Sequence, residues 1–159
     1  MTSKKLAFQL NVILVVLAGL IGLVFLVFIP SVGNQFRLDS EEYAKFFIPF
    51  LIWVIVASIP LFYTVFLLYK VVRRVAVDAF FEPENYQNIY SVSKIIRWDV
   101  IVNLVLFTIC LFSLDVNPGF ILVCAGLALI GILISKFFEL LAVWIEKGTE
   151  IKIENELTI

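Results

Sequence analysis

The chain has 159 residues, of which 62% are hydrophobic, 15% aromatic and only 16% charged, and this composition excludes a water-soluble single domain. The 12 Lys and Arg nearly balance the 13 Asp and Glu, so no excess of positive charge predicts direct binding of DNA or RNA. The chain contains no His, which excludes His-based catalytic triads and His-ligated metal sites. The composition therefore indicates an integral membrane protein.

Four apolar stretches predict four membrane-spanning helices, because a bilayer core of about 30 Å needs roughly 20 apolar residues in a helix. They cover residues 6–29, 46–69, 95–114 and 119–144, and leave a tail at 145–159. The first stretch is longer than the central region of a signal peptide, roughly 7–15 residues, so we interpret it as a retained anchor. The expected fold is an all-α polytopic membrane protein, a single-domain four-helix transmembrane bundle.

The distribution of Lys and Arg predicts the orientation of these spans. Only Arg37 and Lys45 fall in the loop after the first span, and the turn at 115–118 carries neither residue type. All the other cations lie at the N-terminus, in the middle loop or towards the C-terminal end of the chain. The positive-inside rule therefore predicts that both termini and the middle loop lie in the cytoplasm and that the first and third loops lie outside.

The segments between the spans carry their own signals. The outer loop, 30–45, holds Asp39 and Glu42 at the spacing of a capping box, which predicts the start of the second helix. The second helix is expected to continue to Val77, and Pro83 predicts a fresh helix start. The face made by Tyr86, Ile89, Tyr90 and Ile96 favours an interfacial helix leading into the third span, with contact to a partner as the alternative.

In the tail, apolar residues recur at every second position, which is the period of a strand and not of a helix. Its apolar residues, Ile151, Ile153, Leu157 and Ile159, share one face of an extended strand. Such a strand could add to a partner's sheet or fold back on the middle loop. A frayed tail is the equal alternative.

A group of ionisable and polar residues lies near the predicted cytoplasmic ends of the third and fourth spans. At 1.5 Å per residue, Asp99 falls about 22 Å from the outer end of its span and Lys136 about 25 Å from the outer end of its own. We therefore expect one polar cluster, in which structural pairing of helices is favoured over a transport site. Its candidate members are Arg97, Asp99, Asn103, Lys136 and Glu139.

Catalytic chemistry lacks the residues it needs. Cys110 and Cys124 fall close to the outer turn, where a disulfide is geometrically conceivable, but buried Cys is more often a small apolar side chain. Two Cys without His are a poor metal site, and no nucleophile is accompanied by a base and an orienting group. We expect a protein that is not an enzyme and that uses no cofactor or metal.

Two short motifs carry a resemblance to a known family. The segment Phe81-Glu82-Pro83-Glu84-Asn85 precedes the third span, and the chain ends in Glu154-Asn155-Glu156-Leu157-Thr158-Ile159. This pattern resembles an uncharacterised family of small bacterial four-span membrane proteins, a domain of unknown function. In that family a Phe-x-x-Glu-Asn motif precedes the third span, and a peptide similar to Glu-Asn-Asp-Leu-Thr-Ile ends the chain. Here Glu156 replaces the usual Asp, and Pro83 lies within the first motif.

The resemblance implies genes that often lie beside a small helix-turn-helix regulator, and it transfers no catalytic residue. We therefore expect a non-enzymatic protein of a bacterial cell membrane that binds or modulates such a cytoplasmic partner. The alternatives are a small transporter, channel or toxin-immunity protein that uses the polar cluster, and a structural subunit of a larger complex. The candidate docking residues are Glu84, Asn85, Tyr86, Asn155, Glu156, Leu157, Thr158 and Ile159.

Overall fold

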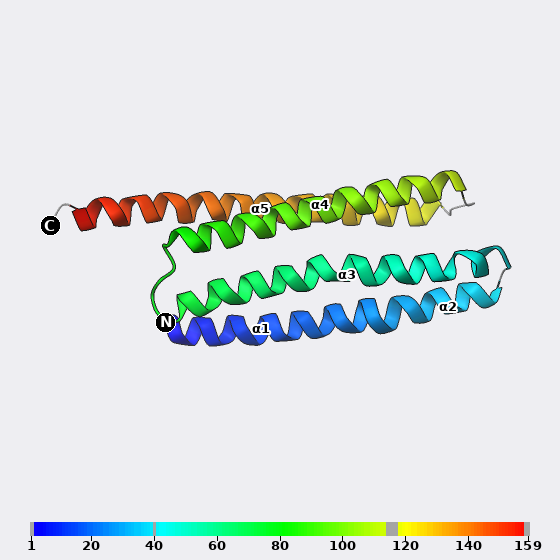
Figure 1. The fold of residues 1–159 in the computed structure, drawn as a ribbon, viewed down its shortest axis with the longest axis horizontal. Coiled ribbons are helices and arrows are strands. Elements are labelled where there is room, and N and C mark those ends of the chain that lie inside the picture. Colours follow the sequence, from blue (N-terminus) through cyan, green and yellow to red (C-terminus); the bar gives the residue numbers. More distant parts are fainter. Residues whose placement is uncertain (1, 40, 114–117, 158–159) are drawn as a thin grey trace.

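The computed structural model describes residues 2–39, 41–113 and 118–157, with positions 39, 42, 43, 110, 112, 113, 118 and 120 described for the backbone only. Its elements are, in chain order, α1 (Ser3–Leu23), the π-helical stretch η1 (Val24–Phe28), α2 (Ile29–Asp39), α3 (Glu41–Val75), α4 (Pro83–Ser113) and α5 (Pro118–Leu157) (Figure 1). Helices are the only regular structure in these ranges, which confirms the all-helical class.

Within the described ranges, three helical stretches are long and apolar enough to cross a membrane: Ser3–Leu38, Ala44–Val75 and Ile121–Leu157. The most apolar windows of the first and third are only 6% buried within the chain, so their side chains face outwards, as lipid-facing side chains do. The predicted span 95–114 belongs to α4, which is not among the three, and its last residue lies outside the described residues. These stretches confirm that the chain is a membrane protein.

The first helix does not end where the sequence predicts, at Pro30. α1, η1 and α2 follow one another without a break to Asp39, and α3 begins at Glu41, so the predicted outer loop at 30–45 is wrong. Pro30 removes a backbone donor and its ring crowds the preceding turn. The chain widens to a π-helix just before this proline, with the Ile29 N–H donating to the Val24 carbonyl, and this wider turn accommodates the ring. The capping box at Asp39 and Glu42 lies outside the described side chains.

α4 is one helix that begins at Pro83, as predicted. The sequence analysis expected its early face to lie in the membrane interface or against a partner, whereas most of this face packs within the chain. Ile89 is 5% exposed and packs with Val71 of α3 and with Ala142 and Ile145 of α5, and Tyr86 and Tyr90 lie against the same cluster. The first turns of α4 therefore contribute to one of the buried clusters of the molecule.

The tail forms neither a strand nor a frayed end up to Leu157, because α5 continues through it. A helix that is already formed adds residues without a new nucleation cost. Half of the segment 146–157 consists of Glu and Lys, which are good helix formers. These two effects outweigh the alternating apolar pattern of the tail.

The helices pack in chain order. Among the described residues α1 and α2 pack against α3, α3 against α4 and α4 against α5, while α1 does not approach α4 or α5 closely (Figure 1). The buried clusters lie at the end that holds the N-terminus and the linker between α3 and α4. The second cluster joins Ala7 and Leu14 of α1 to Val72 of α3. This end is therefore the best-packed part of the protein.

Candidate functional site

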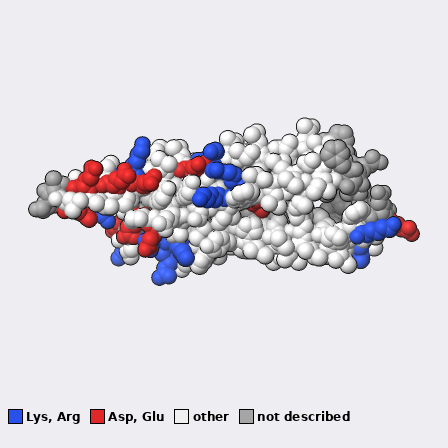
Figure 2. All heavy atoms as spheres, turned by 45° about the horizontal axis from the view of Figure 1, so that its top comes forward, with Lys and Arg blue, Asp and Glu red and all other residues white. Residues whose placement is uncertain are grey.

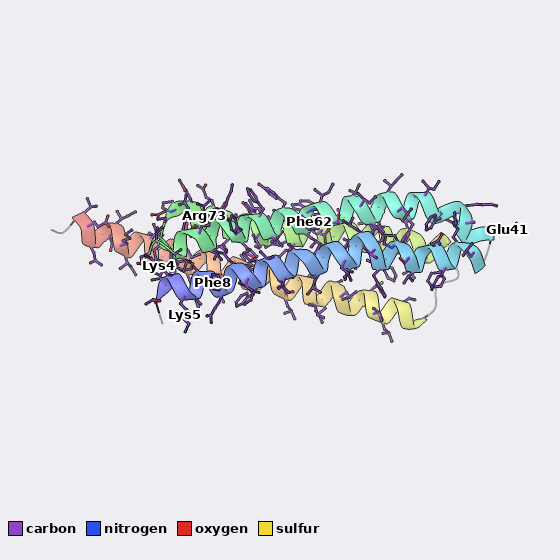
Figure 3. All side chains as sticks on the ribbon, turned by 90° about the horizontal axis from the view of Figure 1, so that it is seen from below. Lys4, Lys5, Phe8, Glu41, Phe62 and Arg73 are labelled. Atoms are coloured by element: carbon purple, nitrogen blue, oxygen red, sulfur yellow. The ribbon has the colours of Figure 1, made fainter. Side chains whose placement is uncertain are left out.

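Charged side chains gather at the same end of the molecule as the buried clusters, with a smaller group at the opposite end (Figure 2). Lys4, Lys5 and Arg73 lie at the first end and Glu41 at the other (Figure 3). We call the first the charged end. It contains the α3–α4 linker, a set of polar contacts between α4 and α5, and the C-terminal turns of α5.

The linker, residues 76–82, is tightly held. α3 closes with the Ala79 N–H on the Arg74 carbonyl at 3.0 Å and the Asp78 N–H on the Val75 carbonyl at 3.2 Å. This is the Schellman arrangement, which requires a left-handed residue, and Asp78 supplies it with a φ of 58°. The Asp78 carboxylate also accepts a hydrogen bond of 2.5 Å from the Ser3 hydroxyl. The linker is thus joined to the start of α1.

Asn85 fixes the linker to α4. The side chain is fully buried, and its Nδ2 donates to the carbonyls of Ala79 and Phe80, both at 2.9 Å. Arg74 forms ion pairs with Glu82 and with Glu84 across the same linker. The sequence analysis proposed Glu84 and Asn85 as docking residues; Asn85 is fully buried within the chain, whereas Glu84 pairs with Arg74 and keeps a side chain that is 62% exposed.

Tyr86, the third docking candidate of this segment, is half-buried against the core and stacks on Tyr90 with ring centroids 5.8 Å apart. Burial, followed by the negative charge of Glu146, raises the pKa of Tyr86, so its phenol is neutral at physiological pH. This residue too is engaged within the chain.

Phe80 and Phe81 connect the linker to α5. Their rings meet edge to face with centroids 5.2 Å apart, and Phe81 lies so close to Gly148 that a Cβ there would stand 2.3 Å from its Cδ1. Gly148 therefore gives the ring access to α5. An open apolar groove of about 370 Å³ lies beside this contact, and its walls include Leu141, Trp144 and Ile151.

A second set of polar contacts joins α4 to α5. The Ser135 hydroxyl donates to the Ser93 carbonyl at 2.9 Å, and both side chains are buried. One turn further along α4, Arg97 and Lys136 converge on the same oxygen of Glu139, at 2.6 and 2.9 Å. The structure thus brings together three of the five predicted cluster residues. Ser135 was not singled out from the sequence, because a lone Ser in an apolar helix carries little signal.

Asp99 and Asn103 lie on another face of α4. Two residues correspond to about 200° around a helix, so Asp99 points away from the side that carries Arg97. Asn103 Nδ2 donates to the Asp99 carbonyl at 2.7 Å, and no ion pair joins Asp99 to Lys136 in the described part of the chain. A transport site built on that pair has no geometric support, whereas the contacts of Arg97 and Glu139 hold two helices together.

The last turns of α5 leave all other helices (Figure 1). Thr149 is still buried, and its hydroxyl bonds to the Ile145 carbonyl, but every side chain from Glu150 to Leu157 is exposed. We call this segment, residues 150–157, the projecting segment. It contains the docking candidates Asn155, Glu156 and Leu157, whereas Thr158 and Ile159 lie outside the described residues.

No group of three or more Cys, Asp and Glu side chains that could hold a metal occurs among the described residues. Cys124 is a free cysteine, and the side chain of Cys110 lies outside the description.

The comparison with known proteins identifies a family. The sequence profile described as "Protein of unknown function (DUF2975)" matches residues 31–159, which include the linker, the paired charges of α4 and α5, and the projecting segment. No curated protein and no solved structure matches the chain significantly. The resemblance to an uncharacterised family is confirmed, and the chain belongs to the DUF2975 family of proteins of unknown function.

Proposed function

We propose that this protein crosses the plasma membrane of a bacterium four times, with both termini in the cytoplasm, and holds a cytoplasmic helix-turn-helix regulator on its projecting segment. The orientation is supported by the charges, since Arg37 and Lys45 are the only Lys or Arg residues outside the segments expected on the cytoplasmic side. The length of α5 supports the proposal that its C-terminal segment extends beyond the membrane. Its 40 residues span about 60 Å, twice the bilayer core.

One observation carries the partner proposal: an exposed, ordered helix end with a mixed acidic and apolar surface. Ile153 and Leu157, 47% and 82% exposed, follow at a spacing of four residues and share a helix face with Glu150 and Glu154. Glu156 adds a further acid, against a single cation at Lys152. An apolar stripe flanked by acids fits a partner whose surface is basic with a small apolar patch.

The DNA-binding face of a helix-turn-helix protein is basic, because it neutralises phosphates. We infer that the projecting segment competes with DNA for that face, so the regulator is inactive while it is held at the membrane. The ordered linker supports this function indirectly. It packs Phe81 against Gly148 and so holds α5 in place up to the point where the segment begins.

The test is copurification from gently solubilised membranes. We expect a helix-turn-helix protein to be recovered with the full chain, and to be released by added duplex DNA. Ile153→Asp combined with Leu157→Asp should reduce recovery by at least tenfold, and the control Leu38→Asp, at a position that is 72% exposed at the opposite end, should not. Equal recovery with the double variant, or a recovered set without such a regulator, would contradict the proposal.

A transporter, channel or immunity protein is the less favoured function. It would need a charged pair such as Asp99 with Lys136, and Asp99 lies on another face of α4 from Arg97, the residue that contacts Glu139 of α5. The ion pair between Arg97 and Glu139 instead favours a structural role, in which it holds α4 and α5 together.

A further inference from the structure

The face between α4 and α5 carries a groove that is separate from the projecting segment. It has a volume of about 260 Å³, and its walls are mostly apolar side chains with two cations at one end. Val100, Ile101 and Leu104 of α4 form one wall and Ile132 of α5 the other. Arg97, Lys136 and Ser135 complete the lining. A groove with a cationic end and apolar walls suits an amphipathic ligand that has an anionic head and an apolar body.

The charges around the cationic end do not cancel. Of the carboxylates that the structure describes, Glu139 alone is bonded to Arg97 and Lys136, and both cations contact the same oxygen atom, so the three groups keep a net charge of +1. Lys136 is 63% exposed and uses one of its three N–H groups on Glu139, and Arg97 has further donors beyond those on Glu139 and Ser93. Donors remain for an anion from outside the chain.

The depth of the groove matches that of a lipid in the inner leaflet. In the proposed orientation Arg97 and Lys136 lie near the cytoplasmic end of their spans, and Leu104 lies about 10 Å deeper into the membrane. Trp98, which follows Arg97, is 66% exposed, and Trp is the residue that favours the headgroup level. The cations therefore stand at the phosphates, and the apolar walls stand beside the acyl chains.

We propose that this groove binds an anionic phospholipid of the inner leaflet, with its phosphate on Lys136 and Arg97 and one acyl chain along Val100, Ile101 and Ile132. Basic pockets between membrane helices on the cytoplasmic side are a known mode of anionic lipid recognition. The lipid adds a charge partner and apolar contacts to the α4–α5 pair. This inference rests on the membrane orientation proposed above and not on the regulator.

The test is native mass spectrometry of the full chain in mild detergent with equal amounts of phosphatidylglycerol and phosphatidylcholine. We expect phosphatidylglycerol to be retained about fivefold more often. Lys136→Gln should lower its retention about fivefold, because one cation at an anionic headgroup is removed. Lys70→Gln, an exposed cation on α3 outside the groove, is the matched control and should leave retention unchanged. Ile101→Trp should fill the groove and lower retention with no change of charge.

Glu139→Gln separates lipid binding from a purely structural role of the cluster. It removes the ion pairs but raises the net charge, so we expect retention of phosphatidylglycerol to increase. Equal retention of the two lipids, or unchanged retention in both Lys136→Gln and Ile101→Trp, would overturn the proposal. So would displacement of the lipid by soluble glycerol phosphate, because that result would show an anion site without a chain groove. The projecting segment is intact in all these variants, so failure here leaves the proposed regulator binding standing.

Discussion

Asn85 offers the sharpest test of the linker, because its side chain is fully buried and donates two hydrogen bonds of 2.9 Å to the Ala79 and Phe80 carbonyls. Asn85→Ala removes both bonds and leaves two carbonyls without that donor. A net hydrogen bond contributes about 1 kcal/mol, and a buried group left unpaired costs about 1–3 kcal/mol. We expect a loss of about 2–4 kcal/mol, or on the order of 10 °C in melting temperature for a chain of this size.

The assay is thermal unfolding of the purified protein in detergent, with Gln87→Ala as the control, since Gln87 is exposed on the same helix. Asn85→Asp adds a test by pH. Its carboxylate would face two carbonyl oxygens, so its folded pKa would rise above the ordinary value of about 3.9. The loss of stability should then grow as the pH rises above that ordinary value, and be larger at pH 8 than at pH 5. An Asn85→Ala variant that melts within about 2 °C of Gln87→Ala would refute the capping role.

Three further substitutions test other contacts by the same melting assay. Gly148→Ala should cost about 1–3 kcal/mol because its Cβ would meet the Phe81 ring, whereas Gly126→Ala, which has open space, should be neutral or stabilising by up to about 1 kcal/mol; equal effects would show that the close contact is unimportant. Asp78→Val should destabilise by more than about 1 kcal/mol through its φ of 58°, and Asp78→Gly should cost less despite losing the same carboxylate; the reverse order would contradict the left-handed turn. Ser135→Ala should cost about 1 kcal/mol for one buried hydrogen bond, and no change would argue against the serine contact between α4 and α5.

The sequence was most informative where one local signal acted alone. Hydropathy predicted the helical class, and Pro83 predicted the start of α4, since proline suits a first helical turn. The prediction that the first helix ends at Pro30 was wrong, although proline usually marks a helix end. Within a long apolar helix a π-turn accommodates the proline at less cost than exposing unpaired backbone groups to lipid. Helix stop signals read from the sequence take no account of the surrounding lipid.

The site was harder to predict because its residues are defined by partners far along the chain. Asn85 follows a plausible helix start and was expected on the surface, whereas its role depends on how residues 79 and 80 turn back over it. Arg97 and Glu139 are 42 positions apart and were grouped correctly by depth, but depth gives no angle around the helix, so Asp99 was assigned to the same group. A helical wheel for α4 would have separated them.

The central claim is that the projecting segment holds a cytoplasmic regulator, and site-specific photocrosslinking in living cells tests it most directly. A photoreactive amino acid at Ile153 should give a covalent adduct with a helix-turn-helix protein, and the same probe at Leu38, at the opposite end of the chain, should not. An adduct of that protein at Leu38, or none at Ile153 while the chain is inserted in the membrane, would contradict the account.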